Sequence, residues 1–389
     1  MGSRFSLFSL VLRVVVCLGM AGPAMAAGDA RAPQRGLAYY DVFVDGDTVH
    51  LLTGYRDADP GTVSLWYRRS TDAGVQWSAP VRVDAGGSGV FAPHPGETPQ
   101  IAAQGARVLV LWNRLDDQGK PAGLATRLST DGGAHFRDGA NPAGDGAEDY
   151  HALAELGADA QGFYAVWLHG AQRGGRAPQA VHVAISADGS TWLAEQRIDG
   201  DTCECCWNRV LARGGRLGVL YRGGGPRDMR FAWRDGAQWR HRVVGEFRWD
   251  FKGCPHVGGA LAATGSALHA LVWTGKEGQA GLYALRSDDE GKSWSEPLRL
   301  GGDAAVHSDL AAAEDGSLIA VWDADGAVQS ARSGDGGAHW SAPRPLGAGP
   351  NQRFPRVAAT PAGTLSLWIE GPREDSYLQS TRGEVPVPR

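Results

Sequence analysis

The chain lacks the features of helical and membrane-spanning proteins. No stretch longer than about ten residues repeats apolar side chains at the helical period of about 3.6 residues. Beyond residue 26, no apolar run reaches the length needed to cross a bilayer. The 389 residues include only 5 cysteines and 4 methionines, but 56 glycines and 14 tryptophans. Frequent tight turns and aromatic side chains packed between strands predict an all-β protein.

A surplus of basic charge is also absent. The formal net charge is −5, and it falls to −7 when Arg4 and Arg13 are removed with the amino-terminal segment. Acidic and basic residues are mixed along the chain. Because proteins that bind nucleic acid usually carry a basic patch or stripe, this composition argues against such a partner.

The first 26 residues have the composition of a secretory signal peptide. They contain two arginines, the apolar stretch VLRVVVCLGM and, at the end, Ala24-Met25-Ala26. This ending fits the A-x-A cleavage rule. We therefore expect residues 1–26, with Cys17, to be removed, and residues 27–389 to form one periplasmic or secreted domain without a transmembrane segment.

Short segments with the plan S-x-D-x-G-x-x-W, or a close variant of it, recur along the chain. The copies are STDAGVQW from Ser70, STDGGAHF from Ser129, SADGSTW from Ser186, SDDEGKSW from Ser287 and SGDGGAHW from Ser333. A degenerate sixth copy, WRDGAQW, spans residues 233–239. In such a box the Asp carboxylate accepts turn amides, Gly supplies positive φ, and the aromatic side chain folds back onto the sheet. Each box is predicted to be a hairpin turn.

The spacing of the boxes predicts the architecture. Their aspartates are 59, 57, 47, 54 and 46 residues apart, counted between Asp72, Asp131, Asp188, Asp235, Asp289 and Asp335. Repeats of about 40 to 50 residues with several short strands are typical of β-propeller blades. A final short unit from Phe354 forms either a seventh blade or part of the first. We therefore expect a monomeric β-propeller with six or seven blades.

The propeller topology predicts which residues meet. Strand one of each blade lines the central channel, and its start lies on the face opposite the boxes. The polar, aromatic and thiol residues expected on that face are Tyr55, Arg56, Glu97, Asn113, Arg114, Tyr150, His151, His169, Cys203, Cys205, Cys206, Arg222, Arg227, Cys254, His256, His307, Asp309, Arg353 and Arg356. Such a mouth suits a glycan or a small anionic ligand.

Four cysteines remain after signal cleavage, in two segments that open neighbouring units. Cys203, Cys205 and Cys206 open the fourth unit, and Cys254 opens the fifth. In an oxidising compartment, disulfides are one interpretation: a bridge from the triplet to Cys254 and a second within the triplet. The other interpretation is a copper or zinc site in which His256, His151 or His307 assists the thiolates of Cys203, Cys205, Cys206 and Cys254.

The repeated boxes resemble those of the sialidase superfamily, also called bacterial neuraminidase repeat or Asp-box proteins. The resemblance covers residues 37 to about 381. TCECCW from Thr202, Tyr221-Arg222, Arg227-Asp228 and GCPHVGG from Gly253 resemble a subgroup of exported bacterial proteins named exo-α-sialidases by homology.

This resemblance implies a site in which arginines bind a substrate carboxylate and a carboxylic acid and a tyrosine carry out hydrolysis. Transferred to this chain, the substrate-binding residues are Arg222, Arg227, Arg356 and Arg56. The catalytic residues are Tyr377, which Glu374 precedes, and the carboxylates of Asp309 and Glu97. The F-R-I-P stretch of the family is missing from the first unit.

Two functional hypotheses remain at this point. The first is an exported, sialidase-like propeller that binds or hydrolyses acidic, sialylated glycans and needs no cofactor. The second is a non-catalytic periplasmic protein with a Cys/His site for copper or zinc, or an interaction scaffold.

Overall fold

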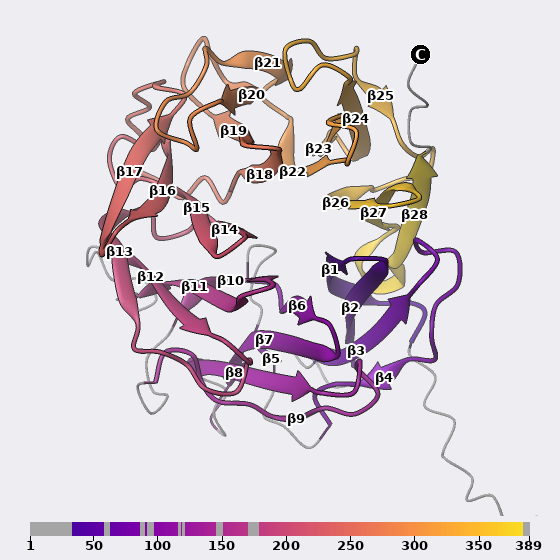
Figure 1. Cartoon of the computed structure of the whole chain (residues 1–389). Helices are drawn as coiled ribbons and strands as arrows, with labels where there is room; N and C mark the ends of the chain where they lie inside the picture. Colours follow the sequence, from indigo (N-terminus) through magenta and orange to yellow (C-terminus); the bar gives the residue numbers. More distant parts are fainter. Residues whose placement is uncertain are drawn as a thin grey trace, which may run out of the picture. The chain divides into compact units, whose positions relative to one another are not determined.

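The computed structural model describes residues 33–57, 63–85, 90–91, 97–115, 118, 121–144, 151–169 and 179–383. The predicted signal segment lies outside this range, and so does Tyr150. The described chain forms seven small antiparallel sheets arranged around a central axis (Figure 1). No helix in these ranges is long and apolar enough to cross a membrane.

Each sheet is one blade, and its strands follow one another outward from the axis (Figure 1), except that β5 and β6 of blade two both pair with β7. Blade one contains β1 (Leu37–Asp45), β2 (Thr48–Arg56), β3 (Val63–Ser70) and β4 (Val81–Arg82). Blade two contains β5 (Val90–Phe91), β6 (Gln100–Gln104), β7 (Arg107–Leu115), β8 (Pro121–Ser129) and β9 (Arg137–Asp138). Blade three contains β10 (Ala152–Asp159), β11 (Gly162–His169), β12 (Gln179–Ser186) and β13 (Gln196–Thr202). Blade four contains β14 (Arg209–Arg213), β15 (Arg216–Arg222), β16 (Met229–Asp235) and β17 (Gln238–Val244). Blade five contains β18 (Ala260–Thr264), β19 (Ala267–Thr274), β20 (Gly281–Ser287) and β21 (Leu298–Gly301).

The last two blades come from the carboxy-terminal part of the chain. Blade six contains β22 (Val306–Ala312), β23 (Leu318–Ala324), β24 (Ala327–Ser333) and β25 (Arg344–Pro345). Blade seven contains β26 (Arg353–Thr360), β27 (Gly363–Glu370), the 3-10 turn η1 (Arg373–Asp375) and β28 (Tyr377–Gly383). The short final unit is therefore a seventh blade, and this decides between the six and seven blades expected from the sequence.

The ring closes between blades seven and one without mixing their strands. The Leu37 amide donates to the Ser376 carbonyl at 3.0 Å, and the Ser376 hydroxyl donates to the Leu37 carbonyl at 2.7 Å. A shared apolar cluster, which includes Val49, Leu51 and Leu367, fills the space between the two sheets. Side-chain packing and these loop hydrogen bonds thus replace a shared strand.

The boxes are turns between the third and fourth strands, as predicted. In the box of blade one, the Ser70 hydroxyl donates to Asp72 Oδ1 at 2.7 Å and accepts the Gly74 amide at 2.8 Å. Asp72 Oδ1 also accepts the Gln76 amide at 2.8 Å. The same bonds recur around Asp131, Asp289 and Asp335. The degenerate copy is instead a two-residue hairpin, in which Asp235 pairs with Gln238.

The aromatic residues that end the boxes pack against the preceding blade. Phe136 meets Tyr67 edge to face at a centroid distance of 5.4 Å, and Trp294 meets Phe231 in the same way at 5.6 Å. Trp77, Trp294 and Trp340 are half-buried. This is less than the large burial between strands that we expect of these side chains.

A β-bulge begins strand one in blades three, six and seven. There the register places two residues opposite one, between Ala152 and Glu155, Val306 and Asp309, and Arg353 and Arg356. Each bulge contains a residue with positive φ: Leu153 (53°), His307 (50°) and Phe354 (51°). Bulges re-aim the side chains next to them. The polar residue that follows each bulge lies at the start of the channel.

Candidate functional site

Five charged residues from five different blades meet at the channel mouth. They are Asp41 on β1, Glu155 on β10, Arg209 on β14, Asp309 on β22 and Arg356 on β26. Arg209 lies 2.9 Å from Glu155 (Nη1 to Oε1) and 3.5 Å from Asp309 (Nη2 to Oδ1). Arg356 Nη2 lies 3.5 Å from Asp41 Oδ1. We call this group the inner charge cluster.

Two of these carboxylates also join neighbouring blades. Asp41 Oδ2 accepts the Ile101 amide of blade two, and Asp309 Oδ2 accepts the Val357 amide of blade seven, each at 3.0 Å. Burial raises the pKa of Asp41 and of Glu155, although nearby guanidinium groups oppose the shift. The inner charge cluster therefore combines a structural role with carboxyl groups whose pKa is raised by burial.

A small cavity of about 60 Å³ lies beside this cluster. Glu155, Arg209 and Arg356 form its polar wall, and Trp207 and Phe354 form its aromatic wall. His307 lies between these two rings, with centroid distances of 5.6 and 4.3 Å. Its Nδ1 lies 2.8 Å from the Asp323 carboxylate. The cavity has room for a small substituent but not for a sugar ring.

A larger cleft of about 680 Å³ adjoins the cavity and shares Ala38, Tyr39 and Phe354 with it. Its volume falls within the range of about 300–1,000 Å³ that is common for small-molecule sites. Arg56, Arg353 and Arg373 also line it. We call it the arginine cleft.

Two of the arginines of this cleft, Arg56 and Arg353, donate to backbone oxygens rather than to carboxylates. Arg56 Nη1 donates to the carbonyls of Leu37 and Arg373 at 3.1 and 3.0 Å, and Arg353 Nη1 donates to those of Asn351 and Gly371, both at 2.8 Å. Within the described ranges, none of the three cleft arginines lies within 4.0 Å of a carboxylate oxygen.

The arginines also lie close enough to repel one another. Burial lowers the pKa of Arg56, and the charge of Arg373 lowers it further. Burial likewise lowers the pKa of Arg353, with a further contribution from Arg56. Asp323 and Asp325 also line the cleft, and the charges of Asp323 and Glu374 partly offset the repulsion at Arg353 and Arg56. Guanidinium groups that lie close together without a carboxylate at ion-pair distance are suited to receive an anion.

Some of the site residues predicted from the sequence lie at this mouth. Arg56 lines the arginine cleft, and Asp309 and Arg356 belong to the inner charge cluster. Glu97 is 3% exposed and accepts a hydrogen bond from the Asn113 side-chain amide at 3.1 Å. Burial raises the pKa of Tyr39 in the cleft, and the charge of Glu97 contributes to this increase.

Tyr377 lies on the outer strand β28. Its hydroxyl donates to Glu370 Oε1 at 2.6 Å, and this hydrogen bond raises the pKa of Tyr377. Glu370, rather than the predicted Glu374, is therefore its partner. Tyr377 does not line the cavity or the arginine cleft.

Arg222 and Arg227 lie apart from Arg356, so the predicted arginine group is not brought together in one cavity. Arg222 donates to the carbonyls of Val257 and Trp273, both at 3.0 Å. Arg227 Nη1 lies 3.0 Å from Glu204 Oε2. Arg222 ends β15 and Arg227 lies in the loop that follows it, next to the cysteine triplet.

The sequence reasoning did not single out Glu155, Arg209 and Arg373. The position of Glu155 in its repeat could have indicated its role. It follows His151 near the start of strand one in blade three, and Asp309 and Arg356 occupy the corresponding positions after the bulges of blades six and seven. Arg373 lies on η1, and its place in the cleft depends on the closure between blades seven and one.

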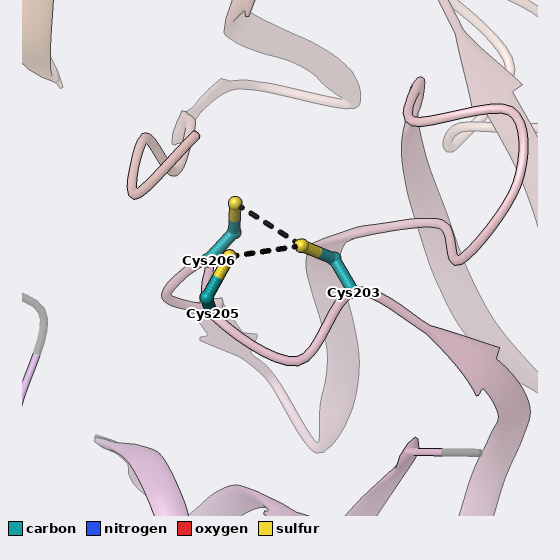
Figure 2. A group of neighbouring side chains, drawn as sticks. All are labelled: Cys203, Cys205 and Cys206. Atoms are coloured by element: carbon teal, nitrogen blue, oxygen red, sulfur yellow. Dashed lines mark hydrogen bonds between the residues drawn. The ribbon is translucent and has the colours of Figure 1, made fainter. Parts of the chain in front are cut away.

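The triplet Cys203, Cys205 and Cys206 forms a buried group in the loop between β13 and β14. Figure 2 shows the Cys203 sulfur directed toward the other two. Its Sγ lies 3.5 Å from that of Cys205 and 3.4 Å from that of Cys206. These two neighbouring thiols lower the pKa of Cys203, and burial raises the pKa of Cys206 to about 12.

The disulfides expected from the sequence are absent among the cysteines of the described chain. A disulfide needs a sulfur separation of about 2.05 Å, whereas Cys203 lies at contact distance from two sulfurs at once. Cys254 is exposed, with its Sγ 3.6 Å from Glu204 Oε1. The nearby His256 directs Nδ1 to the Cys254 carbonyl at 2.9 Å.

Comparison with known proteins shows similarity of fold only. No protein-family model matches the chain, and no curated protein matches it in sequence. An α-L-arabinanase from Penicillium chrysogenum, solved with arabinobiose, is 12% identical with a TM-score of 0.54, over 89% of this chain and 93% of its own. The polysaccharide lyase Uly1 is 11% identical with a TM-score of 0.54, over 92% and 91%.

The NanB sialidase from Streptococcus pneumoniae is 10% identical, with a TM-score of 0.46, over 90% of this chain and 68% of its own. At these identities the comparisons establish a seven-bladed β-propeller and no particular family. The same fold carries unrelated functions, so the function has to be argued from the site.

Proposed function

We propose that this protein binds an acidic saccharide at the arginine cleft. The observation that carries the proposal is the grouping of Arg56, Arg353 and Arg373 in one cleft, where the described residues supply no acidic partner within 4.0 Å. A planar guanidinium matches a carboxylate or sulfate group with two parallel hydrogen bonds. Such an anion would relieve the repulsion among the three arginines.

The remaining walls of the cleft suit a sugar. Tyr39 and Phe354 supply aromatic surface at the point where the cleft meets the inner cavity. Aromatic faces pack against the apolar faces of pyranose rings, while polar groups around them fix the orientation. The sugar would lie across these two residues with its acidic group toward the arginines.

Hydrolysis of the bound saccharide is a second candidate function. Glu155 favours it, because this residue lines the inner cavity and burial raises the pKa of its carboxyl group. A general acid at a glycosidic bond needs such a raised pKa. In this assignment Glu155 donates the proton, and the resemblance to sialidases supports an acidic sugar as substrate.

The fold comparisons and the predicted signal peptide fit this proposal. Two propellers of similar fold are an arabinanase solved with arabinobiose and a polysaccharide lyase, both carbohydrate-active by their descriptions. We propose further that the protein acts in the periplasm or outside the cell, where glycans are accessible.

Calorimetric titration with a sialylated trisaccharide and with its neutral disaccharide core tests the proposal. We expect binding of the charged ligand only. Because a hydrogen bond to a charged group contributes about 1.5–3 kcal/mol, Arg353→Gln and Arg56→Gln should each weaken binding about tenfold to 100-fold.

Arg344→Gln is the matched control, since Arg344 lies exposed on the outer strand β25 and outside the cleft. Equal affinity for the two saccharides would contradict the proposal. So would an equal loss of affinity in Arg353→Gln, Arg56→Gln and Arg344→Gln. Release of free sialic acid by the wild type, and its loss in a Glu155→Gln protein that is shown to be folded under the assay conditions, would establish the second candidate function.

A further inference from the structure

The cysteine triplet has no part in the proposed saccharide site, yet its surroundings are highly ordered by hydrogen bonds. The Cys203 amide donates to the Arg222 carbonyl at 2.9 Å, and the Arg227 amide donates to the Trp249 carbonyl at 2.8 Å. These bonds join the loops that follow β13, β15 and β17. All three thiols are buried, with exposed fractions of 1%, 5% and 1%. The group is therefore held in place before any ligand arrives.

The separation of the sulfurs matches the needs of a single metal ion. For metal–sulfur bonds of about 2.3 Å, ligand sulfurs lie about 3.8 Å apart in a tetrahedral site and about 4.0 Å apart in a trigonal one. The observed separations from Cys203 are 3.4 and 3.5 Å, and the three sulfurs all lie within 4.8 Å of one another. If the sulfur atoms moved apart by a few tenths of an ångström, all three could surround one ion.

A buried cation lies beside the triplet. Arg222 is 1% exposed, and its guanidinium donates to backbone carbonyls and lies 5.5 Å from the centre of the Trp249 ring. Within the described ranges it has no carboxylate partner at ion-pair distance. A buried cation of this kind is costly unless a counter-charge lies nearby. The Arg222 carbonyl accepts the Cys203 amide at 2.9 Å, so thiolates bound to a metal ion would place such a counter-charge beside it.

We propose that Cys203, Cys205 and Cys206 bind one soft metal ion, with Cu(I) as the best fit. Soft thiolate ligands select Cu(I) and zinc among common ions. Zinc in a closed site takes four ligands, whereas Cys254 is exposed beside Glu204 and outside the group of three. Binding releases one proton from each thiol that is protonated and changes no oxidation state. The resulting tris-thiolate carries two negative charges, one of which Arg222 offsets.

Competition for Cu(I) tests this proposal on the reduced, full-length mature protein. Under anaerobic conditions, the protein should take one equivalent of Cu(I) from a chromophoric Cu(I) chelator. X-ray absorption at the copper edge should show three sulfur neighbours at about 2.3 Å. Cys203→Ser and Cys206→Ser should weaken binding by more than the roughly 10- to 100-fold that loss of an outer-shell contact costs.

Two variants serve as controls. Cys254→Ser removes the thiol outside the group, and His182→Gln disrupts the other set of ligand atoms in the described chain, His169, His182 and Glu195. Both should keep one equivalent of Cu(I) with unchanged affinity. Because the absorption measurement uses the wild type, it stands even where a serine variant fails to fold.

Failure to remove Cu(I) from the chelator, or a copper shell dominated by nitrogen, would overturn the proposal. A loss of binding in Cys254→Ser together with stoichiometric zinc would replace it with a four-thiolate zinc site. Isolation of the exported protein about 2 Da lighter by mass, with a reduced form that binds no metal, would assign the triplet to a disulfide instead. None of these outcomes depends on the saccharide site.

Discussion

The Arg209 guanidinium lies 2.9 Å from the Glu155 carboxylate, although the two residues belong to different blades. Both side chains are nearly buried, with exposed fractions of 12% and 9%. The pair joins blades three and four at the axis and forms the polar wall of the inner cavity.

Glu155→Gln should destabilise the protein, because it leaves the Arg209 charge with only the more distant Asp309 as partner. Removal of one member of a buried ion pair typically costs about 3–5 kcal/mol. Urea unfolding of both proteins measures the difference. Asp235→Asn is the control, since Asp235 and its partner Arg240 are 66% and 57% exposed. An exposed pair contributes about 1 kcal/mol or less, and equal losses in the two variants would contradict the structural role of the buried pair.

The box aspartates should make stability depend on acid pH. The Ser293 hydroxyl and amide hold the pKa of Asp289 at about 2, below its usual 3.8. Because the folded-state pKa is depressed, the contribution of this carboxylate is fully present above pH 3.8 and is lost as the pH falls toward 2.

Denaturation midpoints of the wild type and Asp289→Asn, measured over that range, test this linkage. The difference between the denaturation midpoints of the two proteins should be constant near neutral pH and should shrink as the pH falls from about 4 to about 2. A gap that does not change with pH would show that the carboxylate charge is irrelevant to the turn.

The blades were predictable from the sequence because the boxes are local. The bonds among Ser70, Asp72 and Gly74 join residues within a few positions of one another, so a repeated pattern reports a repeated turn. The number of blades was not predictable in this way. It depends on the contact between Leu37 and Ser376, which are 339 positions apart.

The site was predictable only in part, for the same reason. Asp309 and Arg356 follow bulges in strand one, which a repeat pattern can locate. The arginine cleft depends on Arg56, Arg353 and Arg373, which different loops bring together at the closure of the ring. The position of Cys254 outside the cysteine triplet likewise depends on the folding of loops after β17.

Tryptophans in one cluster should differ in their effect on stability. Trp322 is 2% exposed in the core between blades five and six, and Trp340 is half-buried at its edge. Trp322→Ala should cost about 3–5 kcal/mol, as expected for removal of a buried aromatic side chain. Trp340→Ala should cost less, because part of its ring already contacts water. Urea unfolding at neutral pH compares the two variants, and equal losses would mean that the box aromatic is as essential as the core residue.

A crystal structure of the protein with a sialylated saccharide tests the central claim most directly. The account predicts the carboxylate of the ligand at about 2.7–2.9 Å from guanidinium nitrogens of the arginine cleft, with the sugar ring against Tyr39 or Phe354. A ligand bound on the box face, or a cleft that stays without ligand at a saturating concentration, would contradict it.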